Sequence, residues 1–151
     1  MAESLALLGS QPNVLTNCSQ NKPENIAVLA VREIFHTADW VRWGSLNNLL
    51  PTLAEAAPDE FLNAIESALQ LSHCPFDELF LQEGDRITSG NYLTGLLWAL
   101  EGLAWDQTYL VRACVILGNL ASHDPGGKWA NRPANSLETI LLPWLPQTIA
   151  S

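Results

Sequence analysis

LLWALEGLAWDQTYLVRA, residues 96–113, carries the strongest helical pattern in the chain. Apolar side chains recur three to four positions apart on both sides of Trp105-Asp106, which is the spacing of amphipathic helices rather than of strands. Asp106 can accept hydrogen bonds from the first backbone N–H groups of the second segment, as helix N-cap residues do. The pattern therefore predicts two antiparallel helices joined by a tight corner at residues 105–106.

A second stretch, LLPTLAEAAPDEFLNA at residues 49–64, has the same organisation 47 positions earlier. Its corner is Ala-Pro-Asp, so that Asp59 can cap the returning helix as Asp106 does. A period near 47 residues lies within the range of HEAT and armadillo repeats, which are stacked helix hairpins. Two interpretations stay open: a true helical repeat, or chance similarity between two hairpins rich in Leu and Ala. The matching positions are Leu49, Leu50, Leu53, Ala57 and Asp59 against Leu96, Leu97, Leu100, Ala104 and Asp106.

Helical patterns extend over most of the remaining chain, and no segment shows the strict alternation of a strand. We expect a loosely ordered segment over residues 1–22 and a single helical-repeat domain over residues 23–151. The predicted class is all-α, with antiparallel helix hairpins stacked as a short HEAT-like α-solenoid or as an irregular helical bundle. The expected helices span residues 24–36, 45–56, 58–71, 75–82, 90–105, 106–122 and 136–146. The second of them begins near Asp39 or near Ser45, and Pro51 within it requires either a late start or a kink.

The composition is acidic and poor in charge. The net charge is −9, and 15% of the 151 residues are charged against 48% hydrophobic. Nucleic acids and anionic membranes are therefore unfavourable partners, because both bind through clustered Lys and Arg. So few charges also indicate that some apolar side chains face another protein or another part of a longer chain. We expect a protein partner, or other domains of the same chain.

The cysteines and the chain's hydrophobic segments point to the cytoplasm. Cys18, Cys74 and Cys114 are odd in number and far apart, with no CxxC spacing, which favours a reducing compartment over a disulfide framework. Cys114 lies in an apolar helix and is expected to act as a small buried hydrophobe. No secretory signal and no membrane span is recognisable from the sequence.

The loop SHDPGGKWANRP, residues 122–133, invites comparison with a phosphate-binding loop. A phosphate loop needs a preceding strand and a Ser or Thr after Gly-Lys, whereas Trp129 follows Lys128 here. We therefore predict a helix stop and a corner, with Asn135 or Ser136 capping the next helix. The projecting side chains are candidate partner-binding residues, since Trp and Arg are enriched at binding hot spots. These candidates are Lys128, Trp129, Asn131 and Arg132. The alternative is that Trp129 folds back onto the core and Arg132 caps a carbonyl.

Glu101 and Arg112 are charged residues inside two strongly apolar helices. They lie at comparable distances from the corner at residues 105–106, on opposite arms of the predicted hairpin. A partly buried ion pair between them would fix the register of the two helices.

Residue patterns for catalysis or metal binding do not emerge. His36, His73 and His123 never occur as an i, i+4 pair, so a metal site would need convergence in the tertiary structure. Ser72 next to His73 is not a catalytic arrangement, which requires side chains aimed at one another. We expect no enzymatic activity, no catalytic or metal-binding residues and no cofactor. A solvated acidic face is the expected role of Asp77, Glu78, Glu83 and Asp85.

The stretches LLPTLAEAAPDEFL, GLLWALEGLAWDQTYL and DPGGKWANRPANSLETILLPWLPQT resemble the helical-repeat region of very large bacterial proteins. Those multidomain proteins pair helical repeats with an NTPase module, in the style of signal-transducing and anti-phage NTPases. The resemblance covers roughly residues 40–148 and is most specific in its last stretch. It implies a fragment of a longer chain whose nucleotide-binding module lies elsewhere, because no Walker sequence is present.

We conclude from the sequence that the chain is a non-catalytic interaction or scaffold module, with sensing of a foreign protein as one possible role. The alternatives are a stand-alone small helical enzyme with a site assembled from scattered residues, and a dimeric adaptor.

Overall fold

The computed structural model describes residues 3–4, 6, 22–82 and 91–142, and every regular element in these ranges is helical. The prediction of an all-α fold is confirmed. The segment predicted to be loosely ordered, residues 1–22, lies outside the described residues except at positions 3, 4, 6 and 22. The elements are α2 (Lys22–Phe35), α3 (Trp40–Ser45), the 3-10 helix η2 (Asn47–Leu49), α4 (Leu50–Ala56), α5 (Pro58–Leu69), α6 (Pro75–Leu81), α7 (Thr94–Ala104), α8 (Gln107–His123) and α9 (Pro133–Leu141).

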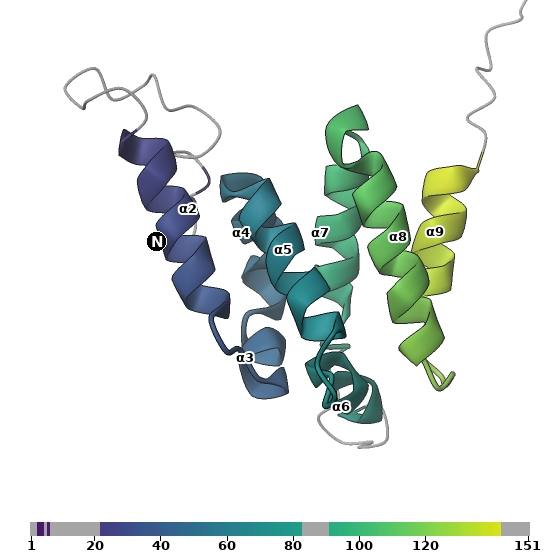
Figure 1. The fold of residues 1–151 in the computed structure, drawn as a ribbon. Coiled ribbons are helices and arrows are strands. Elements are labelled where there is room, and N and C mark those ends of the chain that lie inside the picture. The colour runs from purple at the N-terminus through teal and green to yellow at the C-terminus, as the bar shows by residue number, and fades with distance from the viewer. Residues whose placement is uncertain (1–2, 5, 7–21, 83–90, 143–151) are drawn as a thin grey trace, which may run out of the picture.

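The longer helices form two layers (Figure 1). Helices α2, α5 and α8 contact one another in sequence along one layer, and α4, α7 and α9 do so along the other. The two layers are joined by the antiparallel pairs α4–α5 and α7–α8. The short helices α3 and α6 pack together at one end of the layers. This arrangement stacks one hairpin beside the next.

The two hairpin corners differ in how the returning helix begins. Asp106 is the N-cap of α8 and accepts a hydrogen bond of 2.8 Å from the backbone N–H of Thr108, as predicted. The prediction that Asp59 caps α5 is wrong, because Ala57 is the N-cap and Pro58 is the first helical residue. Proline is favoured at that position because its ring presets a helical φ. The carboxylate of Asp59 is consequently displaced into the first turn of α5.

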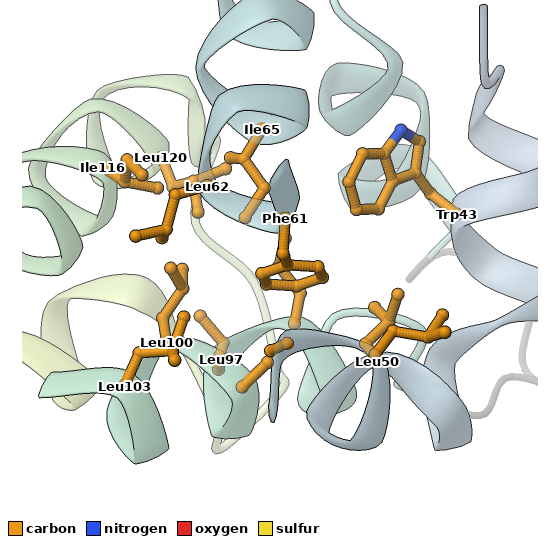
Figure 2. Close-up of a cluster of buried hydrophobic side chains, with 14 of the residues drawn as sticks. Trp43, Leu50, Phe61, Leu62, Ile65, Leu97, Leu100, Leu103, Ile116 and Leu120 are labelled. Carbon is orange, nitrogen blue, oxygen red and sulfur yellow. The ribbon is translucent and has the colours of Figure 1, made fainter. Parts of the chain in front are cut away.

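The hydrophobic core lies between the two layers (Figure 2). Phe61 of α5 is completely buried in the middle of it, beside Leu97 of α7. Trp43 of α3 stacks on Phe35 of α2 with ring centroids 4.3 Å apart, and it meets Phe76 of α6 edge to face at 5.1 Å. The aromatic side chains thus bind the two short helices to the two-layered part of the molecule.

A close contact joins η2 to the start of α7. The backbone N–H of Gly95 donates a hydrogen bond of 2.8 Å to the side-chain oxygen of Asn47. A Cβ atom at position 95 would lie 1.7 Å from the backbone oxygen of Asn47, so only glycine fits there. The side-chain amide of Asn47 also donates a hydrogen bond of 3.4 Å to the backbone carbonyl of Asn91. The side-chain amide of Asn91 in turn donates one of 3.4 Å to the backbone carbonyl of Asn131. Three asparagines therefore link three successive parts of the chain.

The loop between α8 and α9 is a helix stop and a corner, as predicted. Helix α8 ends at His123, and Gly126 has a φ of 77°, a left-handed conformation that favours glycine. The predicted cap at Asn135 or Ser136 is wrong, because α9 already begins at Pro133 and Arg132 is its N-cap residue. The side chain of Asn135 instead donates a hydrogen bond of 2.8 Å to the carbonyl of Ala130.

Candidate functional site

Two tryptophan side chains stand exposed on one face of α7. The exposed fraction of Trp98 is 58%, and that of Trp105, the C-cap residue that follows the helix, is 74%. Seven residues make almost two helical turns, so the two side chains lie in line. Gly102 lies between them on the same face, and a Cβ there would meet nothing within 4 Å. Exposed tryptophans on an open helix face are uncommon on a surface that has no partner, since Trp is highly buried on average.

A hollow of 370 Å³ adjoins this face, where α4 and the start of α5 meet α7 and the start of α8. We call it the Trp98 hollow. Its charged rim residues are Glu55 and Asp106, both exposed carboxylates. The backbone hydrogen bond from Thr108 holds the pKa of Asp106 below its ordinary value, so this carboxylate is ionised at neutral pH. The lining consists of Pro51, Ala54, Glu55, Pro58, Trp98, Ala99, Gly102, Leu103, Asp106 and Tyr109.

The predicted partner-binding loop divides into two inward and two outward side chains. Trp129 packs against the core, and the Arg132 guanidinium pairs with Asp124 at 2.5 Å. The Arg132 and Asp124 side chains are only 12% and 9% exposed, so the two ends of the loop are joined by a largely buried ion pair. Lys128 and Asn131 are exposed. A role of the loop in partner binding stays a prediction, which would rest on Lys128 and Asn131.

The predicted ion pair between Glu101 and Arg112 is wrong. Arg112 turns away from α7 and toward α5, where Nε and Nη2 donate to the two carboxylate oxygens of Glu66 at 3.0 and 2.9 Å. Its remaining bonds go to Asp59 at 3.2 Å and to Asn63 at 2.8 Å. Equal distance from a corner fixes the height of two residues along a hairpin, but not the direction in which each side chain points. Arg112 therefore joins neighbouring hairpins rather than the two arms of one.

A larger groove of 770 Å³ opens beside α5, and we call it the α5 groove. Two of the histidines that lack an i, i+4 partner in the sequence, His36 and His73, line this groove. Cys74 and Asp77 line it as well. Burial raises the pKa of the Cys74 thiol, which makes this cysteine a poor nucleophile at neutral pH. The groove therefore offers polar side chains without an activated nucleophile among the four named here.

One convergence beside the α5 groove was not visible in the sequence. The Nδ1 atom of His123, at the end of α8, lies 2.6 Å from Oδ1 of Asp77 on α6. Cys74 Sγ belongs to the same cluster, in which one donor atom of each residue lies within 4.8 Å of the others. The prediction of a solvated acidic face is therefore incomplete for Asp77, which has a specific neighbour in His123. Glu83 and Asp85, which the same prediction included, lie outside the described residues.

Comparison with known proteins finds no match, whether among protein-family models, curated proteins or solved structures. Across the described residues, no helix has the length and apolar character needed to cross a membrane.

Proposed function

We propose that the chain is a non-catalytic protein-interaction module whose main contact surface is the Trp98 hollow with the adjoining tryptophan face of α7. The observation that carries this proposal is the exposure of Trp98 and Trp105 on either side of Gly102. Tryptophan contributes more to binding hot spots than almost any other residue, because it buries a large apolar area at small entropic cost.

The size and charge of the hollow support a partner of particular chemistry. Its volume of 370 Å³ lies at the small end of ligand pockets, which span roughly 300–1,000 Å³, and suits one or two side chains of a protein. Glu55 and Asp106 place negative charge at its rim, and none of the described residues that line it is Lys or Arg. The preferred partner segment therefore carries an apolar or aromatic anchor with Lys or Arg beside it.

The resemblance to large bacterial proteins supports the proposal that this module belongs to a helical-repeat region of a longer, cytoplasmic chain. The partner is then another protein, such as a foreign protein to be sensed, or another domain of the same chain. The low share of charged residues and the net charge of −9 are compatible with such a buried, non-nucleic-acid interface.

Selection of random peptides displayed on phage tests the proposal. Peptides that bind the purified protein are expected to combine a large apolar residue with neighbouring basic residues. Trp98→Ala should weaken their binding by about 30-fold, since truncating a hot-spot residue costs about 2 kcal/mol or more. Binding should also weaken as the salt concentration rises, because the rim charges are exposed.

Val111→Ala is the matched control, since Val111 is an apolar residue on α8 that is at least as exposed as Trp98 and does not line the hollow. Binding that survives Trp98→Ala but is lost in Val111→Ala would refute the assignment of the surface. Sedimentation of the protein without peptide measures its oligomeric state and so tests the alternative of a dimeric adaptor. If the protein is a dimer that dissociates in the Trp98→Ala variant, the Trp98 hollow binds a second copy of the chain.

A further inference from the structure

We propose that Cys74, Asp77 and His123 form a binding site for a divalent transition-metal ion, with Zn²⁺ as the ion that the donor set fits best. This site is separate from the Trp98 hollow and goes beyond the proposed interaction function. Among the described residues, these three form a group in which a thiol, a carboxylate and an imidazole each bring one potential ligand atom to within 4.8 Å of the others.

The fold positions the three ligands from two helices. Cys74 is the N-cap residue of α6 and Asp77 lies one turn later, so both side chains are carried by the same short element. His123 is the last residue of α8, which packs against α6. The histidine arrives from 46 residues farther along the chain than Asp77, and its Nδ1 atom already lies 2.6 Å from the carboxylate.

The chemical types of the three donors select the metal. Thiolate sulfur and imidazole nitrogen favour Zn²⁺ and its neighbours in the first transition series, whereas Mg²⁺ and Ca²⁺ prefer oxygen ligands throughout. Zn²⁺ accepts Cys, His and Asp together, commonly in a tetrahedron with a water molecule as the fourth ligand. Three protein ligands therefore leave one coordination position for water.

The geometry needs only small adjustments to hold the ion. Ligand atoms around tetrahedral zinc lie about 3.3–3.6 Å apart, as follows from bond lengths of about 2.0–2.3 Å. The Asp77–His123 contact of 2.6 Å must widen by somewhat less than an ångström, and the other pairs, all within 4.8 Å, must close by at most about 1.5 Å. Asp77 and His123 can make these movements because their side chains are 49% and 30% exposed, while Cys74 stays fixed in the buried wall.

Access to the site comes from the α5 groove, which Cys74 and Asp77 both line. An ion held by these residues borders solvent-accessible space, so it can enter and exchange without unfolding of the core. The same three residues without a metal would still connect α6 to α8 through the Asp77–His123 contact. Measurement of metal binding separates these two roles.

The test uses tag-free, reduced and chelator-treated protein carrying Cys18→Ser, so that this cysteine cannot compete for metal. Titration with Co²⁺ should produce visible d–d bands of tetrahedral intensity together with a sulfur-to-cobalt charge-transfer band, and Zn²⁺ should bleach both. Saturation with Zn²⁺ at 100 times its Kd should raise the melting temperature by roughly 5–10 °C.

Cys74→Ser should remove the charge-transfer band, and His123→Gln should weaken Zn²⁺ binding by at least about 10-fold. Cys114→Ser and His73→Gln are the controls, because neither residue belongs to the cluster, and both should bind as the parent protein does. His123 is partly exposed, so its variant keeps the test decisive even if Cys74→Ser fails to fold. Absence of cobalt bands and of any zinc-dependent melting shift, or binding that survives both cluster variants, would overturn the proposal.

Discussion

The side-chain oxygen of Asn47 accepts a hydrogen bond of 2.8 Å from the backbone N–H of Gly95. The backbone oxygen of Asn47 occupies the space that a Cβ atom at position 95 would need. The first backbone N–H groups of a helix have no partner within the helix. Asn47 supplies one from 48 residues away, so the capping of α7 is a long-range contact. The start of α7 is thereby fixed against the turn that precedes α4.

Gly95→Ala should lower the free energy of unfolding by about 1–3 kcal/mol, although alanine is the better helix former. The cause is the 1.7 Å approach of the new Cβ to the Asn47 backbone oxygen, which forces η2 and α7 apart. Gly102→Ala is the control in the same helix, where the space is open, and it should stabilise by about 0.5–1 kcal/mol. Urea unfolding of both variants measures the difference, and equal effects would contradict the close contact.

Asn47→Ala should cost about 1 kcal/mol, the usual loss when a capping side chain is removed. The neighbouring Asn48 is exposed, so Asn48→Ala should change stability by less than about 0.5 kcal/mol. Thermal unfolding of the two variants is the measurement. A loss in Asn48→Ala as large as that in Asn47→Ala would show that the cap contributes nothing specific.

Arg112 should couple energetically to Glu66 and not to Glu101. A double-mutant cycle with Arg112→Ala and Glu66→Ala is expected to give a coupling of about 0.5–1 kcal/mol, as for a well-oriented, partly exposed bidentate pair. The same cycle with Glu101→Ala should give a value within error of zero. Coupling to Glu101 of the same size would restore the pairing that the sequence suggested.

Among the exposed loop residues Gly126, Gly127 and Lys128, only the one with a positive φ should be sensitive to substitution. Gly126→Ala should cost about 1 kcal/mol because of its left-handed φ, whereas Gly127→Ala and Lys128→Ala should be nearly silent. Millimolar ATP should leave the melting temperature unchanged, since a loop that follows a helix lacks the strand-to-helix geometry of a phosphate site. A rise with ATP that Lys128→Ala abolishes would show that the loop binds nucleotide.

The Arg32–Glu60 pair should contribute to stability only above the acid range. Arg32 donates to both carboxylate oxygens of Glu60, at 3.0 and 2.8 Å, and these bonds hold the Glu60 pKa below its ordinary value. A depressed folded pKa gives stability that is fully present above the unfolded value, about 4.3, and is lost as the pH falls through the folded value.

Glu60→Gln should therefore lower stability at pH 7, and the difference from the parent protein should vanish as the pH falls well below 4. Urea midpoints measured across this range provide the check. Glu55→Gln is the control, because Glu55 forms no ion pair within the described residues, and its difference from the parent should not follow the same curve. A constant penalty for Glu60→Gln at all pH values would contradict the ionic origin.

Local sequence signals predicted the helices well where capping and periodicity agree, and less well where distant contacts decide. The corner at Asp106 follows from its capping side chain, and Pro51 lies in the first turn of α4, as a helix starting late requires. Helix α9 starts at Pro133 rather than at the predicted residue 136, because proline is favourable at a first helical position and the helix therefore includes the end of the loop motif.

Local sequence signals did not predict the exposed tryptophan face of α7 or the cluster of Cys74, Asp77 and His123. Helix α7 is apolar on nearly every face, so no polar stripe marks Trp98 and Trp105 as the residues left exposed. Cys74 and Asp77 are a helical turn apart in sequence, but His123 joins them only through the packing of α6 against α8. The packing of α8 against α5 brings Arg112 to its partners on α5, which no local spacing encodes.

The two layers share one continuous core, which extends from Val31 in α2 to Leu120 in α8. In long repeat arrays, stability is divided among units and their interfaces, so that ends can open while the middle stays folded. Here Phe61, Leu97 and Leu120 come from three helices yet belong to the same cluster, so loss of one hairpin removes the cover of the next. Residues 22–142 should consequently unfold as one cooperative unit. A fragment that ends between the two hairpins should not fold stably, because it lacks half of this shared core.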